Sequence, residues 1–364
     1  MQEGMGFLLL PLGKRLNTHC MASNLIPIKL FLGKYYTELA YSAIQEKYLH
    51  AGLDTFFDQR YIIQANKAQM IVNPAMSGLS VIITGNELQV SKELYENPNI
   101  VITNSMELPA DLQHSPKSLY TADTFSTIAY LVCQNHTMFH ITGELEEPIY
   151  VRYSSEFEAF YNSVVVFNIA CDLDIEIVEE IESHCAVNVV INYIVQHGAA
   201  LKLTTFYQNH FSAVSFCLRN VVVREGAKYI HVLFGKGSAN VLDENKILAA
   251  ESSSVELLGC VSSKQEFHSV IVMNIDSYDN FLLDYRHVAF RNGSATLTPV
   301  VVGNQCNDRI HSDIRLLSLS DVDSEQHLEK SLDFIKDIAD RAVTDRNTGI
   351  ERFYKNKLKF LRFQ

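Results

Sequence analysis

The sequence lacks the short motifs that mark the common nucleotide-binding and hydrolytic sites. It has no G-x-x-x-x-G-K-[ST] loop, no G-x-G-x-x-G after a strand, no G-x-S-x-G and no H-E-x-x-H. These absences argue against P-loop, dinucleotide, serine-hydrolase and zinc-protease sites. The formal net charge of −12 argues in addition against general nucleic-acid binding, which needs a basic face.

Paired cysteines and long apolar runs are also missing. The seven cysteines are scattered singly with no C-x-x-C pair, which favours a reducing, cytoplasmic compartment over a disulfide framework. No run approaches the roughly 18 apolar residues of a membrane span. In residues 1–27 a short apolar stretch is broken by Pro11 and followed by Lys14 and Arg15, the reverse of a signal peptide. We expect a flexible N-terminus there, or an extension upstream of a true start at Met21.

Short strands dominate residues 148–320. β-Branched and aromatic residues alternate there with polar ones, in runs that recur roughly every 10–13 residues, the spacing of a sandwich, a barrel or a solenoid. The runs are IYVRY (149–153), SVVVFNIA (163–170), DIEIVEEI (174–181), AVNVVINYIV (186–195), AALKLTTFY (199–207), FSAVSFCL (211–218), VVVREGAKYIHVLF (221–234), SVELLGCV (254–261), HSVIVMNI (268–275) and ATLTPVVV (295–302).

The residues that connect these runs favour a solenoid. Hairpin dipeptides are nearly absent, apart from Asn292-Gly293, whereas Gly-Ala steps occur at Gly198 and Gly226. A glycine at a corner accepts a positive φ, which suits a chain that turns and continues in the same sense. We therefore predict a right-handed parallel β-helix core over 148–320, with a Greek-key sandwich as the alternative.

The flanking regions have a different pattern. Residues 28–147 indicate an α/β region, with helices over 28–51 and 122–135 and irregular or weakly helical chain over 52–66. Short strands are expected over 78–84, 87–90 and 99–103, the first two forming a hairpin.

Residues 321–364 indicate a helical region. An amphipathic helix is expected to about residue 343, and its apolar stripe includes Leu328, Leu332, Ile335 and Ile338. The last fourteen residues are basic and interleaved with apolar side chains, Phe353 and Tyr354 among them. They predict either a second helix packed on the end of the domain or a segment that docks on a partner or an anionic surface.

Candidate chemistry is sparse. Cys306 and His311 lie five residues apart and form a candidate soft-metal pair, although two ligands do not make a site. Cys171, Cys217 and Cys260 lie in or beside strands and are expected to be buried.

Two charged or polar pairs remain. Asp284 and Arg286 fall on one face of a strand and Tyr285 and His287 on the other, a pattern typical of a solvated, ion-paired face near Arg291. The adjacent His184 and Cys185 point to opposite faces by the same alternation.

Four stretches carry a resemblance to a known family. They are GLSVIITGNELQVSKELYENPNIVITNSMEL (78–108), DTFSTIAYLVCQNHTMFHITGELEEPIYVRY (123–153), EEIESHCAVNVVINYIVQHGAALKLTTFYQ (179–208) and VVVREGAKYIHVLFGKGSANVLDENKILAAESSSVELLGCV (221–261). In this order they resemble the SufB/SufD family, the scaffold proteins of SUF iron–sulfur cluster assembly, and are closer to the SufD type. The resemblance spans roughly residues 75–320 as a spread of individually weak positions.

The resemblance implies a non-enzymatic, cytoplasmic scaffold built on a parallel β-helix. Its implied partners are a SufC-like ABC-type ATPase, docked by the C-terminal helical region, and a SufB-like subunit or a second copy of the chain. An iron–sulfur cluster is implied at most transiently. The family's D-V-x-C-x-H-G-A-T run is missing after Leu316–Ser320, as is its W-R-Y-T-P-like N-terminal stretch, and Cys306 and His311 do not align with the former. A structural family member without cluster chemistry, or a β-solenoid that binds or acts on carbohydrate, stays open.

Overall fold

The structure is a computed structural model of the 364-residue chain. It describes residues 26–27, 60–63, 69–84, 87–104, 129, 136–155, 159–184, 186–209, 213–237, 240–250, 252–263, 266–275, 280–290, 294–302 and 310–319, with side chains described between residues 69 and 257.

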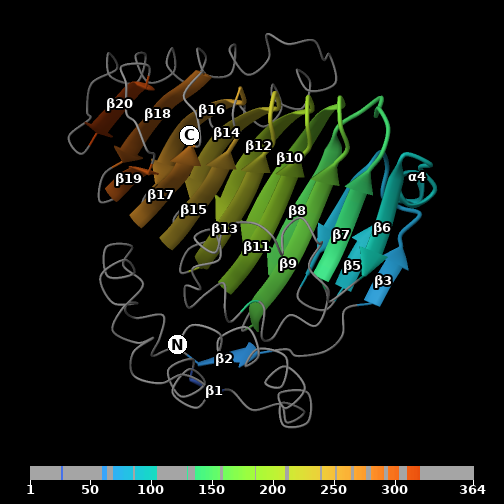
Figure 1. Ribbon diagram of the computed structural model, residues 1–364. Coiled ribbons are helices and arrows are strands. Elements are labelled where there is room, and N and C mark those ends of the chain that lie inside the picture. Colours follow the sequence, from blue (N-terminus) through green and yellow to red (C-terminus); the bar gives the residue numbers. More distant parts are fainter. Residues whose placement is uncertain are drawn as a thin grey trace, which may run out of the picture.

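Two stacked β-sheets form the body of the protein, and from β7 onward successive strands alternate between them (Figure 1). Sheet I contains β6 (Ile100–Asn104), β7 (His136–Ile141), β9 (Ala159–Ile169), β11 (Ala186–Val195), β13 (Val214–Val223), β15 (Asn240–Ala249), β17 (Glu266–Ile275) and β19 (Ser294–Val302), with β1 (Ile26–Pro27) and β2 (Arg60–Ile63) beside β9. Sheet II contains β3 (Gln69–Val72), β5 (Glu87–Val90), β4 (Ser80–Ile83), β8 (Ile149–Ser155), β10 (Asp174–Ser183), β12 (Ala200–Asn209), β14 (Lys228–Gly237), β16 (Ser254–Ser263), β18 (Asn280–Phe290) and β20 (Ile310–Leu319).

From β8 onward each strand pairs in parallel with the strand two places further along the chain. Asp174 pairs with Ala200, and Ala200 pairs with Lys228, so one coil of the solenoid is a strand of sheet I followed by a strand of sheet II. Because the register continues from coil to coil, equivalent side chains stack in columns. Phe139, Phe167 and Tyr193 form such a column, with ring centroids 4.9 and 5.3 Å apart.

The corners that lead from sheet I to sheet II share one backbone conformation. Asp172, Gly198, Gly226 and Ser252 have φ of 58°, 69°, 68° and 57°. The corners also stack, since the Asp172 N–H donates to the His197 carbonyl at 3.1 Å and the Gly198 N–H to the Glu225 carbonyl at 3.3 Å. Glycine lowers the cost of this conformation because it carries no Cβ.

The predicted parallel β-solenoid is confirmed. The expected run over 221–234, however, is two strands: β13 ends at Val223 and β14 begins at Lys228, with the Gly226 corner between them. Strand β15 was not expected. β18 was expected only through the alternation at residues 284–287, and β20 lies beyond the last expected run. Charged residues within β15 hide its strand pattern, and the structure buries them.

At the N-terminal end, the expected β4–β5 hairpin and a strand at β6 are confirmed. A four-residue helix, α4 (Lys92–Tyr95), follows β5, and its N-cap Ser91 accepts a hydrogen bond from the Leu94 N–H. The prediction of irregular or weakly helical chain over 52–66 is wrong for Arg60–Ile63, which form β2. Ala129 is helical, as predicted. The rest of the helices predicted over 28–51, 122–135 and 321–343 lies outside the described residues.

Candidate functional site

Of the predicted metal-binding pair, Cys306 and His311, the structure describes only His311. His311 is the second residue of β20, where its backbone partner on β18 is Leu282, and Cys306 lies outside the described residues. The predicted partner-binding residues lie outside them too: Leu328, Leu332, Ile335, Ile338, Phe353 and Tyr354. Within the described part of the chain, no group of three or more His, Cys, Asp or Glu residues is placed to hold a metal ion.

The cysteine predictions have different outcomes. Cys217 is buried in β13, as expected. Cys171 is exposed, so the prediction that it is buried is wrong; it precedes Asp172 at a solenoid corner rather than within a strand. Cys260 lies in β16, and Cys185 is outside the described residues.

The polar pairs predicted on strands are placed as follows. His184 has its Nε2 atom 3.5 Å from Glu182 Oε1 at the end of β10. Asp284 and Arg286 lie on β18, where their backbone partners on β20 are Asp313 and Arg315.

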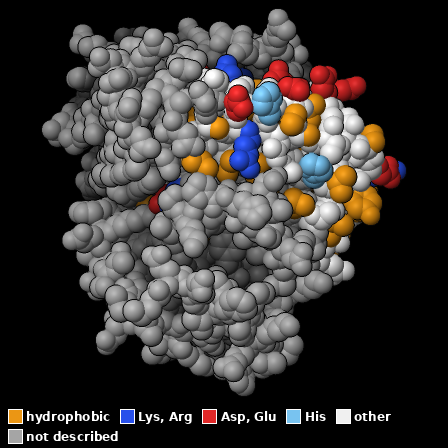
Figure 2. All heavy atoms as spheres, in the orientation of Figure 1, with side chains coloured by type: hydrophobic (Ala, Val, Ile, Leu, Met, Phe, Trp, Pro, Cys, Tyr) orange, Lys and Arg blue, Asp and Glu red, His pale blue; other side chains and the backbone are white. Residues whose placement is uncertain are grey.

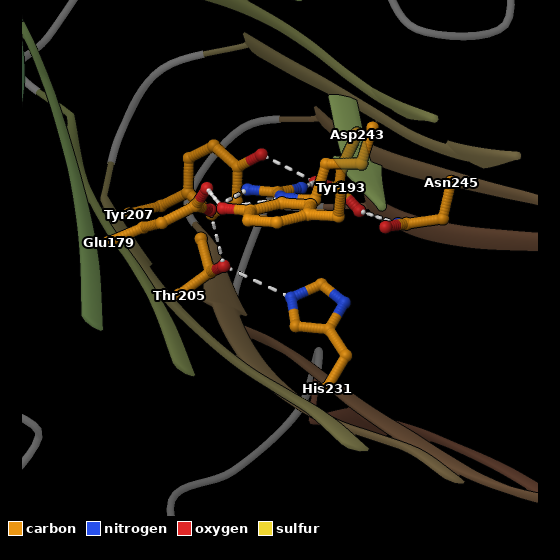
Figure 3. Close-up of polar contacts among 8 residues, drawn as sticks. Glu179, Tyr193, Thr205, Tyr207, His231, Asp243 and Asn245 are labelled. Atoms are coloured by element: carbon orange, nitrogen blue, oxygen red, sulfur yellow. Dashed lines mark hydrogen bonds and ion pairs between the residues drawn. The ribbon is translucent and has the colours of Figure 1, made fainter. Parts of the chain in front are cut away.

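Charged side chains instead meet inside the solenoid. Arg219 on β13 contacts both Glu179 on β10 and Asp243 on β15, and all three side chains are fully buried. We call these residues and their hydrogen-bonded neighbours the interior ionic cluster (Figure 3). Its members are Glu179, Tyr193, Thr205, Tyr207, Arg219, His231, Asp243 and Asn245.

Arg219 connects the two sheets across the interior. Its Nε and Nη2 atoms donate to Glu179 Oε2 at 3.0 and 2.7 Å, and its Nη1 atom donates to Asp243 Oδ1. Glu179 belongs to the β9–β10 coil, Arg219 to the β13–β14 coil and Asp243 to the β15–β16 coil. The Arg219 guanidinium therefore binds two carboxylates, Glu179 and Asp243, whose coils are not adjacent to each other.

Neutral side chains also donate hydrogen bonds to the Glu179 and Asp243 carboxylates. Tyr193 donates to Glu179 Oε1, while Tyr207 donates to Asp243 Oδ1 at 2.5 Å. Asn245 donates to Asp243 Oδ2 at 2.7 Å. Burial is the largest cause of the raised pKa of both tyrosines, and the neighbouring carboxylate raises it further. Both hydroxyls therefore stay protonated and serve as donors.

The protonation of His231 follows from its neighbour Thr205. The Thr205 hydroxyl donates its single proton to Glu179 Oε2 at 2.8 Å, and its oxygen lies 3.0 Å from His231 Nε2. His231 must therefore donate from Nε2, since Thr205 has no second proton. Burial and then the charge of Arg219 lower the pKa of His231 well below its usual value, so the ring is neutral.

The interior ionic cluster is a cross-linking arrangement. Burial raises the pKa of the neighbouring Cys217 thiol well above its usual value, so this thiol stays protonated and is a poor nucleophile. The cluster holds two carboxylates and one guanidinium, and its hydroxyl and amide donors compensate the excess negative charge. Such an arrangement favours the one register of the coils in which each buried charge meets its partners, because a buried charge without a partner is unfavourable.

A second perturbed carboxyl lies outside the cluster. Glu176 on β10 pairs in register with Lys202 on β12, and its Oε1 atom is buried without a hydrogen-bond partner. Burial raises its pKa to about 7, and the charge of Lys202 opposes the rise. Burial also raises the pKa of Tyr150, with a contribution from Glu176.

Sequence reasoning missed the cluster, although the sequence contains a signal for it. Arg219 alternates in phase with Cys217 and Val221, and Asp243 with Val241 and Ile247, all of which are buried. A charged residue at an apolar position of the alternation indicates a buried ionic group. The sequence pattern did not reveal which buried charges meet, because that depends on the register of the coils.

Two comparisons with known proteins found no match for this chain. No family model matches the sequence, and no curated protein matches it. Among the described residues, no helix is long and apolar enough to cross a membrane.

Proposed function

We propose that the chain is a non-enzymatic scaffold subunit of the SufD type, acting in iron–sulfur cluster assembly. The observation that carries the proposal is where the family-like stretches fall. Residues 179–208 run from β10 to the end of β12, and residues 221–261 run from the end of β13 into β16. The resemblance thus follows consecutive coils of a parallel solenoid, the fold that it implies.

The interior ionic cluster supports an architectural role. Its buried charges span the coils from β9–β10 to β15–β16 and favour a single register of these coils. A scaffold holds its partners at a fixed separation, and a solenoid whose coils are cross-linked internally is suited to that task.

The proposed partners are an ABC-type ATPase and a SufB-like subunit or a second copy of this chain. The ATPase would bind the helical region 321–364, through the stripe of Leu328, Leu332, Ile335 and Ile338 and through Phe353 and Tyr354. This assignment rests on the resemblance and on the amphipathic pattern of the sequence.

Co-expression with the ATPase and the SufB-like subunit tests the proposal. We expect the full chain to co-elute with the ATPase in size-exclusion chromatography, and the double variant Leu332→Glu/Ile335→Glu to lose it. The surface variant Arg152→Ala is the control, and it should retain the complex. Absence of a complex in every nucleotide state would contradict the proposal.

Anaerobic purification of the same complex then separates two versions of the role. Absorbance near 400 nm with stoichiometric iron and sulfide, lost in Cys306→Ala or His311→Ala, would assign cluster chemistry to this chain. A colourless complex would identify a family member that has kept only the architectural role, which the missing D-V-x-C-x-H-G-A-T run favours. A colourless protein without a partner would redirect the assignment to a carbohydrate-binding solenoid, testable on glycan arrays.

A further inference from the structure

Among the strands that the structure describes, one sheet of the solenoid ends in a strand with an open edge. β3 is the last strand of sheet II; it pairs in parallel with β5, and its other edge pairs with no strand in the described part of the chain. Figure 1 shows β3 at the end of the solenoid where β5, β6 and α4 also lie.

The hydrogen-bonding groups on the open edge can be identified. The Asn73 N–H donates to the Val90 carbonyl at 2.8 Å, toward β5. Backbone groups alternate in direction along a strand, so Ile71 also faces β5. Met70 and Val72 therefore direct their N–H and C=O groups away from β5, toward the open edge.

After the polar Gln69, the side chains of β3 are apolar, and they are exposed on both faces. Met70, Ile71 and Val72 are 38%, 36% and 39% exposed, whereas Leu88 and Val90 on β5, which pair with Met70 and Val72, are buried. Native edge strands are usually protected by a charge, a proline or a bulge, and Gln69–Val72 contain neither charge nor proline. An added strand would pair with the open edge and cover these side chains.

The surroundings of β3 are acidic. Glu87 on β5 pairs in register with Gln69. Further along the chain, Glu93 in α4 and its C-cap residue Glu96 are exposed, and α4 contacts β4 and β6. Lys92 lies 3.9 Å from Glu96 and offsets part of this charge. Figure 2 shows exposed hydrophobic side chains at this side of the molecule, with acidic and basic side chains together at its edge; most of the acidic side chains visible in this view lie at the top. Because the chain itself carries a net charge of −12, a basic segment complements this edge better than a second copy of the chain would.

We propose that the open edge of β3 binds an extended segment of a partner protein, by addition of a strand to sheet II. The segment has apolar residues at alternate positions, which cover Met70 and Val72, and lysine or arginine at its ends, one of which faces Glu87. This surface lies on sheet II at β3 and is separate from the C-terminal region assigned above to the ATPase.

Binding of a labelled synthetic peptide to the full-length protein tests the proposal. The probe alternates valine and threonine between two terminal lysine pairs, and its control replaces the lysines by glutamates. Fluorescence anisotropy should show saturable binding of the lysine peptide, which weakens as salt is raised, and at least about tenfold weaker binding of the glutamate peptide.

Substitutions at β3 locate the binding. Val72→Pro removes an N–H from the open edge, leaves the β5 ladder intact and should weaken binding about tenfold. Met70→Lys, which keeps the backbone, should also weaken it by repelling the basic peptide. Tyr95→Ala, which removes an exposed side chain from α4, is the matched control and should bind as the wild type does.

Three results would overturn the proposal. They are no binding of the lysine peptide, equal binding by the wild type and both β3 variants, and dimers in sedimentation equilibrium that Val72→Pro dissociates. The last result would assign the edge to a second copy. Failure of the ATPase to co-elute would leave this inference untouched, because the two tests probe different regions.

Discussion

Arg219 and Glu179 lie on opposite sheets of the solenoid, 40 residues apart in sequence, with Arg219 Nη2 2.7 Å from Glu179 Oε2 and both side chains fully buried. The contact passes over the β11–β12 coil, whose Tyr193 and Thr205 donate to the same carboxylate. The interior is therefore held together by long-range polar contacts as well as by its apolar columns.

Removal of the guanidinium should strongly destabilise the fold. Arg219→Met leaves Glu179 and Asp243 buried without their cation, and we expect a loss of about 3–5 kcal/mol in the free energy of unfolding. Urea denaturation followed by circular dichroism measures it. Arg152→Ala is the control: Arg152 pairs with Glu182 at the surface, is 43% exposed, and should cost under about 1 kcal/mol.

A triple variant separates lost charge balance from lost packing. Arg219→Met with Glu179→Gln and Asp243→Asn removes all three charges and should regain most of the stability lost in Arg219→Met. If the triple variant were less stable than the single one, the ionic contacts themselves, rather than their balance, would dominate.

These residues also mark how far the sequence could predict the structure. Alternation located β11 at Ala186–Val195 with its bounds correct, because every one of its residues is apolar, aromatic or asparagine. The same rule missed β15, whose Asp243, Glu244 and Lys246 interrupt the pattern. Asp243 is compatible with a strand because the register of the coils brings Arg219 to it, whereas Glu244 and Lys246 pair with each other within β15, with Lys246 Nζ 3.6 Å from Glu244 Oε1.

The corner residues show a similar division. Gly198 and Gly226 indicated corners correctly, since glycine accepts positive φ. Asp172 and Ser252 adopt the same conformation without glycine. The equivalent corner beside Cys171 therefore gave no such signal, and Cys171 was expected to be buried.

The raised pKa of Glu176 predicts that the folded protein loses stability as the pH rises. Its pKa is raised to about 7 in the folded protein, against 4.5 as the ordinary value, so the folded state holds the proton more tightly than the unfolded state. Stability is greatest below about pH 4.5 for this group and falls as the pH rises through 7. Glu176→Gln should remove this dependence and stabilise the protein by about 1–3 kcal/mol at pH 8. Chemical denaturation at pH 5.5 and 8 measures the difference, and equal differences between variant and wild type at both values would contradict it.

The lowered pKa of His231 predicts that the folded protein loses stability as the pH falls. Its pKa is lowered in the folded state, so the unfolded chain takes up a proton below about pH 6.5 that the folded chain does not. The stability from this group is complete above pH 6.5 and falls as the pH decreases, by up to about 1.4 kcal/mol per pH unit. His231→Gln retains a donor for Thr205 and should flatten the acid side of the stability profile. A variant whose profile below pH 6.5 matches the wild type would show that His231 is not responsible.

The two corner glycines form a matched pair for the last prediction. Alanine at either position places a Cβ at a φ near 70°, which we expect to cost about 1 kcal/mol. At Gly226 the nearest atom to that Cβ is 4.0 Å away, whereas at Gly198 the Asp172 Oδ1 atom lies at 2.2 Å. Gly198→Ala should therefore lower the thermal midpoint more than Gly226→Ala does. Asp172→Gly removes the clashing carboxylate, so Gly198→Ala should cost no more in the Asp172→Gly background, relative to Asp172→Gly alone, than Gly226→Ala costs relative to the wild type. If the two alanine variants melted together, the contact between the stacked corners would not contribute to stability.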